Sequence, residues 1–162
     1  MYGDTAVLYA KARELRTIAV DARDRAKTLR AGAGSAWVSS AAATFTAALG
    51  EHADHIVASA DALDDAADAL EAHARAVDAV KTAIADAERW VSDRWHDAMH
   101  IASNAVEAIE DGVAGFFHVM GAVIPKYAVE SAKDTVRTVP SLPTTGSREW
   151  LGLADTFRSQ GW

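Results

Sequence analysis

The stretch LGEHADHIVASADALDDAADALEAHARAVDAVKTAIADAERWV, residues 49–91, decides the fold. An aliphatic residue recurs in it at every seventh position, and an alanine follows each of the first four by four positions. This heptad row consists of Leu49, Ile56, Leu63, Leu70, Val77, Ile84 and Val91. A period of seven sustained over this length is typical of a coiled-coil helix, so we expect the row to be the interface with a partner. Because no glycine or proline interrupts residues 51–111, one long helix is predicted from about residue 40, with a bend or break between Ser92 and Asn104.

A shorter helix is predicted before the long one, over residues 5–30. Its leucines recur at multiples of seven residues, and Asp4 or Thr5 can cap its start. The following segment AGAGSAWVSS, residues 31–40, holds two glycines that end this helix, the corner tryptophan Trp37, and Ser39 or Ser40 as the next N-cap. Residues 1–30 carry seven Lys/Arg against four Asp/Glu, whereas residues 51–71 carry seven Asp/Glu and no Lys/Arg. We therefore expect the two helices to fold back on each other as an antiparallel hairpin.

The C-terminal third predicts further helices. Apolar residues at three- and four-residue steps continue from Ile101 to Val123, and Pro125 ends or kinks that helix. A short helix is expected over residues 126–138 and an amphipathic one over 148–160, separated by a Pro/Thr/Gly linker. The predicted fold is thus all-α: a hairpin in 1–97, a helical segment in 98–138 that packs on the hairpin or on a partner, and a linker with a terminal helix in 139–162.

Composition excludes several classes of function. The chain has 162 residues, a net charge of −7 and no cysteine. An acidic chain argues against nucleic-acid binding, and the absence of cysteine rules out disulfides and thiolate chemistry. The N-terminus lacks the apolar core of a signal peptide, and the longest apolar stretch, residues 113–124, is shorter than the roughly 20 residues of a membrane span. We expect either a cytoplasmic protein or one exported without a cleaved signal.

Two pairs of histidines are candidates for a metal site or a partner contact. His96 and His100 have the spacing of a helical zinc site, but Asp97 replaces the glutamate of zinc proteases and no third histidine follows. Two solvated histidines one turn apart are the commoner arrangement, and we predict neither metal nor cofactor. His52, beside His55, lies at the edge of the heptad row, where a packing or partner contact is expected.

Three further segments have simpler explanations. The acidic run avoids the heptad row and is interpreted as a solvated face rather than a cation site; it comprises Asp61, Asp64, Asp65, Asp68 and Glu71. Residues 142–146, LPTTG, match the sortase sorting motif, yet no membrane-spanning stretch and basic tail follow. Residues 116–120, FFHVM, fit a core or partner groove better than a membrane anchor. Since no nucleophile–base set or phosphate loop is found, we expect no enzyme.

The corner and the long helix together carry a family resemblance. The segment SAWVSSAAATFTAAL, residues 35–49, resembles the W-x-G…A-x-x-F…L pattern of the WXG100 superfamily, the helical-hairpin substrates of type VII (ESX) secretion in actinobacteria and firmicutes. The rhythm LDDAADALEAHARAV, residues 63–77, is similar to that of the family's longer secreted members. The resemblance covers residues 5–95 and implies that Trp37 and Ser39 form the corner motif.

This chain departs from the family in two places. Ser39 stands where the family has glycine, and the secretion motif Y-x-x-x-[D/E] is absent, because Ser131 follows Tyr127 by four residues and Ala74 precedes Asp78. The resemblance implies a non-enzymatic secretion substrate or targeting module that pairs with another hairpin or with itself and meets the type VII machinery. The alternative from another class is a cytoplasmic coiled-coil adaptor or chaperone for a secreted partner.

Overall fold

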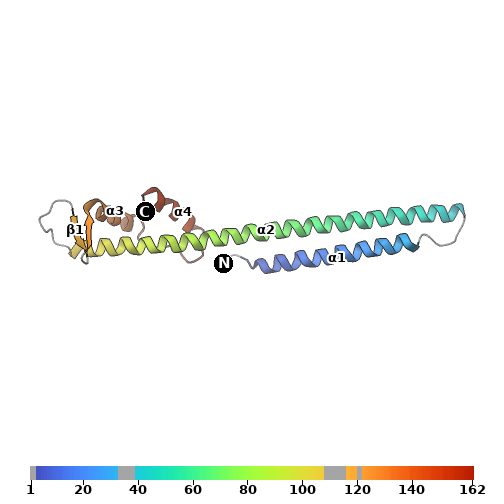
Figure 1. Cartoon of the computed structure of the whole chain (residues 1–162), viewed down its shortest axis with the longest axis horizontal. Helices are drawn as coiled ribbons and strands as arrows, with labels where there is room; N and C mark the ends of the chain where they lie inside the picture. Colours follow the sequence, from blue (N-terminus) through green and yellow to red (C-terminus); the bar gives the residue numbers. More distant parts are fainter. Residues whose placement is uncertain (1–2, 33–38, 108–115, 120–121) are drawn as a thin grey trace. The chain divides into compact units, whose positions relative to one another are not determined.

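The structure, a computed structural model, describes residues 3–32, 39–107, 116–119 and 122–162. Its elements are α1 (Thr5–Gly32), α2 (Ser40–Glu107), β1 (Phe116–Val119), β2 (Ala122–Pro125), α3 (Lys126–Thr138) and α4 (Glu149–Ser159) (Figure 1). Helices make up most of the described chain, so the protein is all-α in class, as the sequence predicts. The chain divides into two compact units, Tyr2–Ala79 and Val80–Trp162, and α2 contributes its first part to one and its remainder to the other.

Both helices of the N-terminal unit begin at a side-chain cap. The amide of Ala6 donates to the Asp4 carboxylate at 2.9 Å, and the amide of Ala42 donates to the Ser39 hydroxyl at 3.0 Å. These bonds satisfy amides that the first helical turn leaves without a partner. The capping role predicted for Asp4 and for Ser39 is therefore confirmed. Trp37 lies outside the described residues.

Ion pairs show how α1 and the first part of α2 are arranged. Arg16 pairs with Glu71, Arg23 with Asp61, and Arg30 with Asp54. As the α1 partner moves forward along the chain, the α2 partner moves backward. Within the N-terminal unit the two helices therefore lie side by side and antiparallel (Figure 1).

The break expected between Ser92 and Asn104 is absent, since α2 continues through this segment to Glu107. Val91 and Ala98, seven residues apart, are completely buried there, and the indole of Trp95 donates to the carbonyl of Val139 at 2.9 Å. This packing stabilises the helix against the weaker helix propensity of the Ser and Asp residues in the segment.

The helix expected up to Val123 is wrong for residues 116–119 and 122–123, which belong to a two-stranded antiparallel sheet; residues 108–115 and 120–121 lie outside the described residues. Phe116 pairs with Pro125 and Val119 with Ala122 in its register. Aromatic and β-branched residues dominate both strands, and Gly112, Gly115 and Gly121 lower the helix propensity of the surrounding sequence. Local β preference therefore outweighs an apolar spacing that also fits a helix.

The two C-terminal helices agree with the sequence. The helix predicted over 126–138 is α3, which starts directly after Pro125, where the backbone is extended (φ −59°, ψ 142°). The helix predicted over 148–160 is α4, which ends before Gly161 at a positive φ of 83°. Trp150, Ala154 and Phe157 of α4 are buried, so the apolar stripe expected there forms part of the core of the C-terminal unit.

Candidate interaction surface

Alanine, not leucine, occupies the centre of the contact between α1 and α2. Each helix buries one row of alanines spaced by seven residues, and every member is 0 % exposed. These alanine rows are Ala12, Ala19 and Ala26 in α1 and Ala53, Ala60, Ala67 and Ala74 in α2. A methyl side chain lets two helix backbones approach more closely than a leucine allows, so the rows favour close packing of the two helices.

Ion pairs line one side of the alanine rows, and we call this side the ionic flank. Arg16 lies four residues after Ala12 and contacts both Asp68, at 2.6 Å, and Glu71. Arg23 repeats the arrangement one heptad later, with Asp61 at 2.6 Å and Asp64 at 2.7 Å. The flank thus holds the two helices in register.

The ionic flank shifts the pKa of its own groups. The hydrogen bond from Arg16 is the main cause that lowers the pKa of Glu71, and hydrogen bonds to Glu71 and Asp68 raise the pKa of Arg16. Near the N-terminal end of α1, the hydroxyls of Thr5 and Tyr9 donate to Asp78 at 2.8 and 3.4 Å. Partial desolvation and Asp78 together raise the pKa of Tyr9. All these groups are solvated at their outer edges, so they favour register more than they add stability.

The leucines, with Ile56 and Val77, lie on the other side of the alanine rows. They follow the buried alanines by three residues or precede them by four, and none of them is fully buried. We call this side the leucine face; it consists of Leu8, Leu15, Leu29, Leu49, Ile56, Leu63, Leu70 and Val77. Because the helices are antiparallel and the ionic flank takes one side, the leucines of both helices lie on the same opposite side. Phe45 and Ile18, which are 57 % and 47 % exposed, extend this apolar surface.

The structure divides the predicted heptad row between two environments. Its first five members, Leu49 to Val77, belong to the leucine face and stay partly exposed. Ile84 and Val91, in the C-terminal unit, are 2 % and 0 % exposed and form core. The exposed part of the predicted partner interface is therefore Leu49, Ile56, Leu63, Leu70 and Val77.

Tryptophans organise the C-terminal unit. The Trp90 ring meets Phe157 edge-on, with centroids 6.5 Å apart, and carries the Arg94 guanidinium 4.1 Å above its centroid. The indole of Trp150 donates to the carbonyl of Thr144 at 3.0 Å, and the amide of Gly146 donates to the Glu88 carboxylate at 3.0 Å. The loop that resembles a sorting motif is therefore folded against its own unit by hydrogen bonds.

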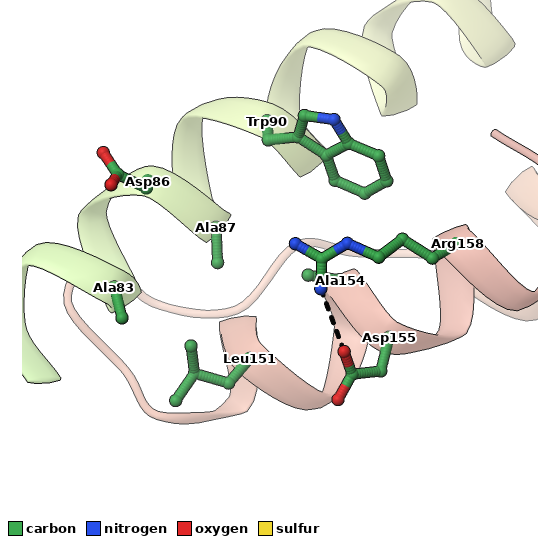
Figure 2. Close-up of a pocket in the computed structure, with 8 residues that line it drawn as sticks. All are labelled: Ala83, Asp86, Ala87, Trp90, Leu151, Ala154, Asp155 and Arg158. Carbon is green, nitrogen blue, oxygen red and sulfur yellow. Dashed lines mark hydrogen bonds and ion pairs between the residues drawn. The ribbon is translucent and has the colours of Figure 1, made fainter.

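A shallow groove lies between α2 and α4, with a volume of about 470 Å³ (Figure 2). Alanines and Leu151 form its apolar surface, while the Arg158 guanidinium lies 5.1 Å from the Trp90 ring centroid and 3.0 Å from Asp155. Its described lining offers carboxylates and a guanidinium but no hydroxyl, imidazole or amine.

The other candidate sites lie on the surface of α2. The imidazole of His96 donates from Nδ1 to the carbonyl of Ser92 and meets Trp95 edge-on. Among the residues that the structure describes, no three His, Asp or Glu side chains group as metal ligands. Of the acidic run, Asp61, Asp64, Asp68 and Glu71 pair with arginines of α1. These carboxylates are thus part of the ionic flank. The opposite charges of residues 1–30 and 51–71 already indicated that the two helices face each other.

No helix in the described part of the chain is long and apolar enough to cross a membrane. Comparison with protein families, with curated proteins and with solved structures finds no match for this chain.

The periodicity of the long helix does not identify the alanine rows as the contact between α1 and α2. Both the alanines and the leucines repeat every seven residues, so periodicity alone does not say which row faces α1. The available signal was the matching alanine row in the first helix, at residues 12, 19 and 26. Two small-residue rows at the same period indicate close backbone approach between the helices that carry them.

Proposed function

We propose that this protein is a non-enzymatic substrate or targeting module of type VII secretion, which pairs through its leucine face with a WXG100-type helical hairpin. The observation that carries the proposal is the partly exposed leucine face along five heptads of α2. Residues of this size and spacing are the usual content of a helix–helix interface, yet α1 buries only the alanine rows completely and leaves the leucines partly exposed. A second hairpin laid on the leucine face would complete a four-helix bundle.

The resemblance of residues 35–49 to the family pattern supports the same proposal. In this account, the corner at Trp37 and Ser39 faces the secretion machinery, and the pairing partner carries the tyrosine-based export signal that this chain lacks. The Ser39 cap supports this interpretation, since serine provides the helix start at the position where the family has glycine.

Export tests the proposal. The protein is quantified in the culture filtrate of the producing strain and of the same strain without its type VII secretion ATPase, with a cytoplasmic enzyme as a lysis control. We expect the protein in the parental filtrate and its loss in the mutant. Equal amounts in both filtrates, or none in either, would contradict export by this route and favour the cytoplasmic adaptor.

A further inference from the structure

The border of the leucine face has a distinct charge. An α-helix turns 100° per residue, so the residue just before each buried alanine lies beyond the leucines and away from the ionic flank. These border positions are Lys11, Ile18 and Arg25 in α1 and His52, Ser59, Ala66 and His73 in α2. All seven are exposed. They include two basic residues and two histidines but no carboxylate, in a chain whose net charge is −7.

The acidic residues of the N-terminal unit are instead concentrated on the ionic flank. Asp54, Asp61, Asp64, Asp68 and Glu71 all pair with arginines of α1. Three arginines offset part of their charge, which lies on the side opposite the leucine face. Lys11, at the border, pairs at 2.6 Å with Glu14 of its own helix, and both side chains are more than half exposed. Such a solvated pair leaves the lysine able to meet a partner carboxylate.

The border charge distinguishes between two occupants of the leucine face. A second copy related by twofold symmetry presents the same border, which gathers Lys11 and Arg25 of both copies at one interface. A hairpin with acidic border residues instead sets carboxylates against these cations and gains steering and orientation. Like charges at such positions also act against the wrong pairing.

We infer that the leucine face takes an amphipathic helical hairpin with acidic border positions in preference to a second copy of this chain. The inference rests on the proposed function, because it names the chemistry of the partner for the same surface. It predicts that affinity depends on the sign of the partner's border charge and that this dependence weakens as salt rises.

Two synthetic helical hairpins test this inference on the full chain. Both carry the same leucine heptads, and their border positions are all glutamate in one and all lysine in the other. We expect titration calorimetry to give at least tenfold tighter binding of the glutamate hairpin. The double variant Lys11→Glu, Arg25→Glu reverses the preference, whereas Arg89→Glu, Arg137→Glu, with the same change in charge but in the C-terminal unit, keeps it.

The outcomes separate the inference from the proposed function. If both hairpins bind equally and Leu63→Asp abolishes binding of both, the preference for an acidic partner is wrong. The leucine face is then still the docking surface. Binding of neither hairpin overturns the pairing on which the proposed function rests. Sedimentation equilibrium measures self-association of the chain. The preference for an acidic partner is contradicted if the chain forms a homodimer more tightly than it binds the glutamate hairpin and Leu63→Asp abolishes that homodimer.

Discussion

The same helix builds two different interiors. In the N-terminal unit, α2 buries alanines completely and leaves its leucines partly exposed. In the C-terminal unit it buries Ile84 and Val91, and the large rings of Trp150 and Phe157 are buried with them. Large apolar side chains are the main source of hydrophobic stabilisation, so the C-terminal unit completes its own core. The N-terminal unit leaves part of that surface exposed, which is what a pairing element requires.

The largest expected difference in unfolding free energy is between two variants that each place a charge at one position of the heptad row. Val91→Asp buries an unpaired carboxylate and should cost about 4 kcal/mol or more of unfolding free energy. Leu63→Asp lies on a partly exposed surface and should cost about 1 kcal/mol or less, while it removes hairpin binding. Urea unfolding followed by tryptophan fluorescence and circular dichroism measures both. If both variants lose a similar amount of unfolding free energy, the two units do not differ in how they bury the heptad row.

Enlarging an alanine row should have the next largest effect. Ala67→Leu inserts a branched side chain at a completely buried position of the row and should cost about 1–3 kcal/mol. The control Ala69→Leu adds the same atoms at an exposed position of the same helix and should change stability by less than about 0.5 kcal/mol. If the two variants unfold at the same urea concentration, alanine is not the contact surface.

A smaller loss is expected at the start of α2. Ser39→Ala removes the hydroxyl that accepts from the Ala42 amide and should cost about 1 kcal/mol. Ser40→Ala, within the first helical turn, serves as the control and should be close to neutral. Thermal unfolding by circular dichroism compares them, and equal shifts would remove the cap assigned to Ser39.

The smallest effect concerns the ionic flank and its dependence on pH. Because the pKa of Glu71 is below its ordinary value of 4.5 in the folded protein, its contribution to stability is fully present above pH 4.5 and is lost as the pH falls from there through the lowered pKa. The stability difference between the protein and Glu71→Gln should therefore be small at pH 7 and smaller still at pH 3. Urea unfolding at both pH values checks this, and a difference that grows in acid would reverse the sign of the argument.

Helix ends and N-caps were predictable from the sequence, because the residues that mark them act locally. Pro125 and Gly161 mark helix limits whatever the tertiary structure, so the two C-terminal helices agree with prediction within a residue or so. Caps at Asp4 and Ser39 depend on the first helical turn alone and were also predicted correctly.

The remainder depended on tertiary contacts that a single helical period does not encode. Leucine and alanine rows share a period of seven, and only the partner helix decides which row is buried. The burial of Ile84 and Val91 depends on packing in the C-terminal unit that the heptad row does not encode. For residues 116–119 and 122–125 the apolar spacing suited a helix, but the β-forming residue types prevailed.

The most direct test of the account is thiol accessibility along the heptad row, which is simple because the chain has no cysteine of its own. Leu63→Cys and Val91→Cys place single thiols four heptads apart, and Ala69→Cys gives an exposed reference. In the isolated protein we expect alkylation of the thiol at 63 to be slower than at the reference but readily measurable, and a far slower reaction at 91. The glutamate hairpin should then slow the reaction at 63 alone. Equally slow alkylation at 63 and 91 without any partner would contradict the claim that the leucine face is open for pairing.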